Sequence, residues 1–158
     1  MQEVYTYSID LTIEQLRIAH FLADGINTYT PRGHWKSIAA THFVQQHCSE
    51  ARWARNIALL NMSLIDAAVV CWDAKSIYIT PRPSQINPDI KTVTGIPNFP
   101  AYISKHSTFS DAASTTLSSI IPENTSKYIT QAKEASMSRL YSAIYYRSDC
   151  EKGLETGN

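Results

Sequence analysis

The sequence predicts an all-α protein, a bundle of about five to six helices that forms a single domain over residues 1–158. Apolar residues recur at steps of three and four over long stretches, which is the spacing of helices that bury one face. Only five glycines interrupt the chain, and most of its prolines lie between residues 81 and 100. With 44% hydrophobic and 18% charged residues, the composition is that of a globular domain able to bury a core.

Helices are expected over residues 12–23, 34–47, 50–78, 107–121 and 125–146, with the start of a sixth over 149–157. Thr12 and Gln15 form a capping-box pattern that begins the first helix. A loop at 24–32, which contains Gly25 and Pro31, separates the first helix from the second.

The third expected helix, 50–78, is the longest and is apolar on most sides, so we predict that it is the central helix of the bundle. Pro81 and Pro83 end it, because proline does not continue the helical hydrogen-bond ladder. The connection at 84–105 is long for a small domain, and long connections are often functional.

The last two long helices have clear signals at their ends or along their length. Ser104 or Ser107 is expected to cap the fourth helix, and Pro122 ends it. The fifth helix has apolar residues at helical spacing from Ile129 to Ile144. No repeat, heptad or low-complexity tract in the sequence favours another architecture.

Charge, hydropathy and cysteine content indicate which binding partners and which cellular compartment are expected for the chain. The formal net charge is zero, so the overall charge does not favour nucleic acid, and any anion site must be local. Residues 1–10 lack the apolar core of a signal peptide. The apolar stretch 57–72 contains Asp66, which favours a buried helix over a membrane span. The three cysteines fit no zinc or CxxC pattern. We therefore expect a cytoplasmic protein with core thiols and no metal site.

Three separated segments carry basic residues that together suit one oxyanion. The first has Lys75 and Arg82, the second Lys105 and His106, and the third Arg139. The planar guanidinium of arginine offers paired donors to phosphate-like oxygens, whereas lysine acts as a point charge. The second segment also begins a helix, whose free N–H groups favour an anion. Taken singly, each basic residue is more often a solvated surface charge, so the prediction depends on their convergence.

In order, these segments resemble the pattern KxxxxxxRP, SxHS and SRxxxxxH of the superfamily of vanadium-dependent haloperoxidases and type 2 phosphatidic acid phosphatases. The segments 29–39, 67–75 and 98–110 are similar to further motifs of its soluble bacterial branch, so the resemblance covers roughly residues 10–156. It implies the helical haloperoxidase/acid phosphatase fold. It also implies a truncated final helix, which predicts that a partner chain in a homo-oligomer completes the pocket wall.

The resemblance implies a role for each matching residue. Lys75, Arg82 and Arg139 would hold the oxygens of the anion, Ser104 would donate a hydrogen bond, and His106 would be the general acid–base residue. The substrate implied is a phosphate-bearing small molecule.

The chain departs from the pattern at the residue that bonds to phosphorus or vanadium. The family has a histidine there and this chain has Tyr145, with Asp149 expected one helical turn further on. Because a phenol has a reference pKa of about 10 and a phenolate is disfavoured beside a carboxylate, we expect a neutral Tyr145 that donates to Asp149 or to a bound anion. Lys105 and Ala143 replace glycines of the family, and Ile103 replaces a proline.

Four functional hypotheses follow. The first is an enzyme of altered chemistry that acts on a phosphate or diphosphate ester, with His106 as acid–base and Lys105 reaching a second phosphate. The second is a catalytically inactive relic that binds an oxyanion or a partner only. The third is an intact haloperoxidase, which needs vanadate held without its histidine ligand, so no cofactor is expected. The fourth is a helical interaction domain whose basic residues are surface charges.

Overall fold

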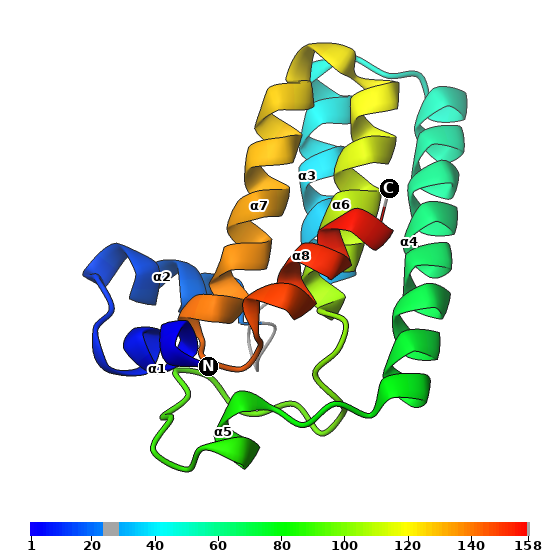
Figure 1. Ribbon diagram of the computed structural model, residues 1–158. Coiled ribbons are helices and arrows are strands. Elements are labelled where there is room, and N and C mark those ends of the chain that lie inside the picture. Colours follow the sequence, from blue (N-terminus) through cyan, green and yellow to red (C-terminus); the bar gives the residue numbers. More distant parts are fainter. Residues whose placement is uncertain (24–28, 158) are drawn as a thin grey trace.

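The computed structural model describes residues 1–23 and 29–157, and this part of the chain contains helices and no strands. The elements are, in chain order, α1 (Gln2–Ile9), α2 (Ile13–Phe21), α3 (Pro31–Gln45), α4 (Glu50–Tyr78), α5 (Pro83–Ile86), α6 (Lys105–Ile120), the 3-10 helix η1 (Pro122–Asn124), α7 (Thr125–Tyr141) and α8 (Arg147–Thr156). The long helices α3, α4, α6 and α7 stand roughly side by side, while α1, α2 and α5 gather at one end (Figure 1). The prediction of an all-α fold is confirmed.

Helix α6 is the centre of the bundle, since it packs against α3, α4, α7 and α8. It is built mostly from serine, threonine and alanine, and these small side chains let the neighbouring helices approach on several sides. The prediction that the 50–78 helix is central was wrong, because α4 lies at the edge (Figure 1) and packs mainly on α6 and α3. Only 22% of its most apolar window is buried, so apolar side chains on most sides of a helix did not mean burial on most sides.

By length and composition alone, the stretch Glu50–Ile86 is also apolar enough to cross a bilayer. Core helices of soluble proteins pass the same test, so the expectation that α4 does not span a membrane stays a prediction.

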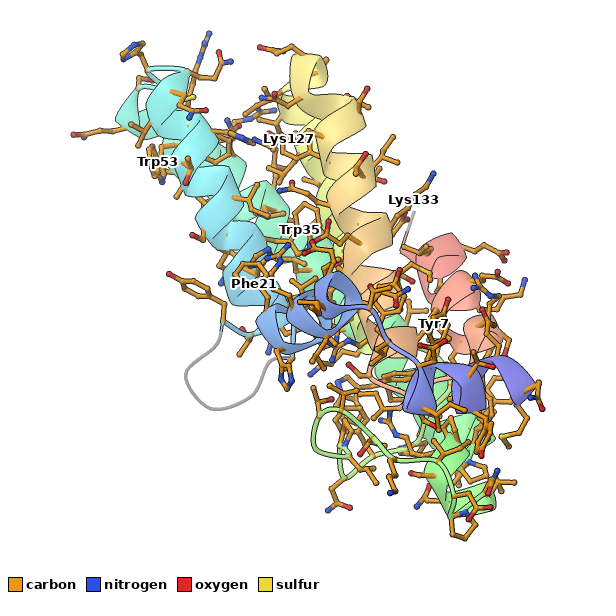
Figure 2. All side chains as sticks on the ribbon, turned by 90° about the vertical axis from the view of Figure 1, so that its left-hand side faces the viewer. Tyr7, Phe21, Trp35, Trp53, Lys127 and Lys133 are labelled. Carbon is orange, nitrogen blue, oxygen red and sulfur yellow. The ribbon has the colours of Figure 1, made fainter. Side chains whose placement is uncertain are left out.

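The main core lies between α3, α4, α6 and α7 and contains Trp35, Phe43, Leu60, Leu64 and Phe109. Trp35 points into the bundle (Figure 2), and its indole Nε1 donates to Ser110 Oγ at 3.0 Å. The hydrogen bond satisfies the one polar atom of a large side chain whose burial stabilises the fold by roughly 1.5–3 kcal/mol. This hydrogen bond therefore fixes the position of α3 along the axis of α6.

Several predicted boundaries are confirmed. The capping box is present, with the Thr12 N–H donating to Gln15 Oε1 at 3.0 Å and the Gln15 N–H donating to Thr12 Oγ1 at 3.2 Å. Helix α4 has the predicted bounds, and Ser104 rather than Ser107 caps α6. Of the loop expected at 24–32, residues 24–28 lie outside the described part of the chain.

Other boundaries differ from the prediction. Helix α7 ends at Tyr141 rather than Tyr146, because Ala143 adopts a left-handed conformation with φ 57°. A left-handed residue does not continue a right-handed helix, so 142–146 forms a turn that leads into α8. Helices α1 and α5 were not predicted. The first has few apolar positions to reveal a period, and the second is a single turn inside the long connection.

Ile79 caps the C-terminal end of α4 in a left-handed conformation, and a substitution there tests the energetic cost of that conformation. Ile79 has φ 45° and ψ 43° and is 69% exposed. The left-handed region costs a non-glycine residue roughly 1–2 kcal/mol, which glycine avoids at some cost in unfolded-chain entropy. We expect Ile79→Gly to raise the free energy of unfolding by about 0.5–1 kcal/mol in urea denaturation. The matched variant Ile77→Gly, inside the same helix, should lower it by about 1 kcal/mol. A loss of stability in both variants would contradict the left-handed cap.

Candidate functional site

The candidate site lies where the C-terminal end of α4, the N-terminal end of α6, the 97–104 segment and the turn between α7 and α8 meet. A cavity of about 520 Å³ opens there, lined by His20, Ala23, Thr94, Gly95, Ile96, Pro97, Phe99, Lys105, His106, Arg139, Ile144 and Tyr145. Four of the predicted site residues thus share one cavity: Lys105, His106, Arg139 and Tyr145. The other four, Lys75, Arg82, Ser104 and Asp149, are buried and do not line the cavity.

Lys75 is 1% exposed, and its ammonium is held entirely by backbone carbonyls. Nζ donates to the carbonyl oxygens of Pro100 at 2.8 Å, Ala101 at 2.9 Å and Ile103 at 2.6 Å. These bonds use the three N–H donors of an ammonium group. Lys75 therefore fastens the last turn of α4 to the segment that precedes α6, and it does not donate into the cavity.

Arg82 is held in the same manner, by carbonyls from two segments. Nη1 donates to the Ile144 carbonyl at 2.8 Å, and Nη2 donates to the Phe99 carbonyl at 3.0 Å. Nη2 also lies 3.4 Å from Tyr145 Oη. The guanidinium thus joins the 97–104 segment to the turn that follows α7.

His106 and Arg139 share one acceptor, the carbonyl oxygen of Leu22. Leu22 is the C-terminal cap of α2, where the helix dipole adds partial negative charge. His106 Nε2 lies 3.0 Å from this oxygen, and Arg139 Nη2 makes a short hydrogen bond to it. Because a carbonyl only accepts, Nε2 of His106 carries a hydrogen. Both groups face the cavity from this anchored position.

Tyr145 lies on the 142–146 turn, and its ring separates the cavity from the two deeper cations. The ring centroid is 4.2 Å from Arg82 Cζ and 5.4 Å from Lys75 Nζ. Burial raises the pKa of the phenol, although the positive charge of Arg82 opposes the shift, so Tyr145 is neutral as expected. Its expected place one helical turn from Asp149 was wrong, because α7 ends before it. Asp149 Oδ2 accepts from the backbone N–H of Tyr146 at 3.0 Å.

Helix α8 presses directly on the start of α6. Ser104 Oγ accepts from the Ser107 N–H, and the Ser104 N–H donates to the Asp149 carbonyl at 3.0 Å. A side chain at Gly153 would bring its Cβ within 2.7 Å of Ser107 Cβ, so only glycine allows this approach. Burial raises the pKa of the Asp149 carboxyl group against the pull of Lys75 and Arg82.

Phe99 is a central residue that the sequence reasoning missed. Its ring centroid lies 5.0 Å from Lys75 Nζ, 5.1 Å from Arg82 Cζ and 5.5 Å from Lys105 Nζ. The negative face of an aromatic ring attracts cations at such distances. The edge of Trp72 packs against the same ring, with centroids 5.2 Å apart. The sequence motif contains Phe99, but nothing in the pattern indicates that it lies between cations.

Positive charge is in excess around the cavity. Among the buried residues that the structure describes, the side chains of Lys, Arg, Asp and Glu type are Lys75, Arg82, Arg139 and Asp149. Buried charges are normally paired, because removing an ion from water costs several kcal/mol. Carbonyl dipoles satisfy the hydrogen bonds of Lys75 and Arg82, but they carry no net charge. Lys75 and Arg82 together outnumber Asp149, so the described buried residues leave net positive charge beside the cavity.

The burial of Lys75 gives a testable pH dependence. Burial lowers its pKa from the ordinary value of 10.5 to about 8. Between these values the unfolded chain binds more protons at this residue than the folded chain, so its contribution to stability rises with pH and is lost as the pH falls through about 8. The measured quantity is the unfolding free energy of the wild type minus that of Lys75→Met at each pH. This difference cancels the opposite pH dependence of the buried cysteines, whose pKa values are raised by burial. The difference should rise from about pH 8 to about pH 10, by at most ~1.4 kcal/mol per pH unit. The exposed-site control, Lys91→Met, should give a flat difference, and a flat difference for Lys75→Met as well would contradict the low pKa.

No protein-family model matches the chain, and no curated protein matches it. Two solved structures do. A bacterial vanadium-dependent iodoperoxidase, described as the first of its kind, has a TM-score of 0.89 and 27% identity over 99% of this chain and 45% of its own. The holo form of a bacterial vanadium-dependent chloroperoxidase has a TM-score of 0.72 at 11% identity, over 99% of this chain and 44% of its own, which shows the fold alone. The chain thus spans less than half the length of either protein. Its fold is that of the vanadium-dependent haloperoxidases, and the likeness to the iodoperoxidase supports the superfamily that the motifs indicate.

Proposed function

We propose that this chain binds a phosphate-type oxyanion, carried by a small organic molecule, in the cavity of about 520 Å³. The observation that carries the proposal is the convergence of cations on that cavity: Lys105 and Arg139 line it, and the buried Lys75 and Arg82 lie beside it. The volume lies within the range of pockets for small organic ligands, about 300–1,000 Å³. Apolar lining residues such as Ile96, Pro97 and Ile144 provide a surface for the organic part.

Arg139 and Lys105 are the groups proposed to contact the anion. Both line the cavity, and Lys105 begins α6, whose N-terminal N–H groups add partial positive charge. Lys75 and Arg82 do not line the cavity and act through their charge. In a hydrolytic reaction, the protonated His106 donates a proton to the leaving ester oxygen as the phosphorus–oxygen bond breaks, water supplies the incoming oxygen, and a proton of that water returns to His106.

Tyr145 is proposed to hold the position of the family's histidine. A neutral phenol is a poor nucleophile, and its ring shields Lys75 and Arg82 from the cavity. This shielding favours the second candidate function, an inactive relic that binds an oxyanion and turns nothing over.

Vanadate does not fit the residues present. Such a group needs a ligand nitrogen and donors directed at its oxygens, whereas Tyr145 offers a neutral phenol and Lys75 spends its donors on carbonyls. The haloperoxidase reading, supported only by the solved structures of similar fold, therefore ranks third. An assay of bromide and iodide oxidation with added vanadate and peroxide tests this hypothesis, and the absence of oxidation would exclude it.

Calorimetric titration with inorganic phosphate, pyrophosphate and orthovanadate tests the binding proposal. A charge-assisted hydrogen bond contributes roughly 1.5–3 kcal/mol, so Arg139→Ala should weaken binding about tenfold or more. The control Lys91→Ala removes an exposed positive charge away from the cavity and should leave the affinity unchanged. Tighter binding of pyrophosphate than of phosphate would indicate a second contact from Lys105. Equal affinity in wild type and Arg139→Ala would contradict the site.

Turnover of para-nitrophenyl phosphate separates the enzyme from the relic. If the chain is active, His106→Ala should reduce the rate at least about a hundredfold, because a general acid contributes that much. If the chain is inactive, the double variant Tyr145→His with Lys105→Gly should create activity where there was none. Activity that survives His106→Ala unchanged would rule out the proposed acid.

A further inference from the structure

One side of α4 is apolar and faces away from the bundle. We define the outer face of α4 by six residues: Leu59, Met62, Ile65, Val69, Val70 and Ile77. Met62, Ile65 and Val69 are 61%, 55% and 64% exposed, although side chains of this type are usually buried. Figure 1 shows α4 at the edge of the molecule, with no other element beyond it.

The extent of this face requires an explanation. Helix α4 has 29 residues and is therefore about 43 Å long. The apolar residues of the outer face follow one another at steps of three and four from Leu59 to Val69, and Val70 and Ile77 extend the face so that it spans more than half of that length. Monomeric proteins rarely expose contiguous apolar patches of more than a few hundred Å², and larger patches usually mark an interaction surface.

The charges beside the outer face are divided between its two halves. Arg52 and Arg55 lie in the N-terminal half, while Asp66 and Asp73 lie in the C-terminal half. All four side chains are exposed, and no salt bridge within the described residues engages them. Such a surface complements a second copy of itself when the second copy runs in the opposite direction.

We propose that the outer face of α4 docks against the same face of a second copy of this chain, with the two helices antiparallel about a two-fold axis. Full overlap of the two helices places Arg55, five residues after Glu50, opposite Asp73 of the other copy, five residues before Tyr78. The same register places Leu59 opposite Val69. This register thus pairs opposite charges and one pair of apolar residues of the outer face, and symmetry repeats each pair.

Asp66 lies near the axis, where the other copy presents Met62 in this register. A carboxylate in an apolar seam opposes association. This residue therefore makes the dimer weaker than it would be with an apolar side chain there, and it supplies an independent check of the register.

Sedimentation velocity of the full chain over a range of concentrations tests the proposal. We expect a reversible dimer, and the single charge reversals Arg55→Glu and Asp73→Arg should each weaken it at least about tenfold. The double variant, Arg55→Glu with Asp73→Arg, restores both pairs and should return the dissociation constant to near its original value. Lys133→Glu reverses an exposed charge on α7, which Figure 2 shows pointing away from the bundle, and should change nothing. Asp66→Leu should strengthen association.

Three results would overturn the proposal. The first is a monomer at every concentration, with the helical circular dichroism of the folded chain intact. The second is a dimer that the charge reversals leave unchanged, because it would use another surface. The third is binding of the monomer to phosphatidylcholine–phosphatidylglycerol vesicles that Val69→Glu abolishes, because the outer face would then contact lipid. Oxidation of the double variant Leu59→Cys with Val69→Cys should give a covalent dimer, and neither single variant should.

Discussion

The site end of this fold depends on three buried cations whose hydrogen bonds go mainly to backbone carbonyls. Lys75 joins α4 to the segment before α6, Arg82 joins that segment to the turn after α7, and Arg139 joins α7 to the end of α2. A second hydrophobic cluster, which includes Ala101, Leu140 and Ile144, packs at this same end, apart from the main core between α3, α4, α6 and α7. Losing Lys75 would remove the donor from the carbonyls of Pro100, Ala101 and Ile103, at roughly 1–3 kcal/mol for each that stays unpaired. The three cations therefore hold these segments together whether or not a ligand is bound.

The same arrangement defines how a ligand competes for the site. The carbonyl of Leu22 occupies donors of both His106 and Arg139, so an incoming oxyanion must offer better acceptors than a carbonyl to take them over. A charged oxygen does so, since hydrogen bonds to ions are about twice as strong as those between neutral groups. Neutral or weakly basic ligands gain nothing from the exchange. In the proposed binding mode, selectivity for anions follows from this competition for the donors of His106 and Arg139.

Features that depend on local sequence signals were predictable. The capping box at Thr12, the bounds of α4 and the cap at Ser104 each follow from side chains near the helix end. The ordered basic motifs also indicated which residues gather around one cavity. The features that the sequence did not predict depend on backbone conformation or on tertiary packing. Ala143 carries no sign of its left-handed conformation, the Leu22 carbonyl is independent of its side chain, and no local pattern shows that the small residues of α6 place it at the centre.

The edge-to-face contact between Trp72 and Phe99 connects the outer face of α4 with the cavity. Trp72 is 46% exposed beside the outer face of α4, while Phe99 lines the cavity and lies between its cations. An indole so placed is a native optical probe, whose emission responds to a change in the orientation of the neighbouring ring and to a change in solvent at its own surface. Trp72, one of three tryptophans in the chain, is therefore placed to report on the state of the cavity and on the covering of α4.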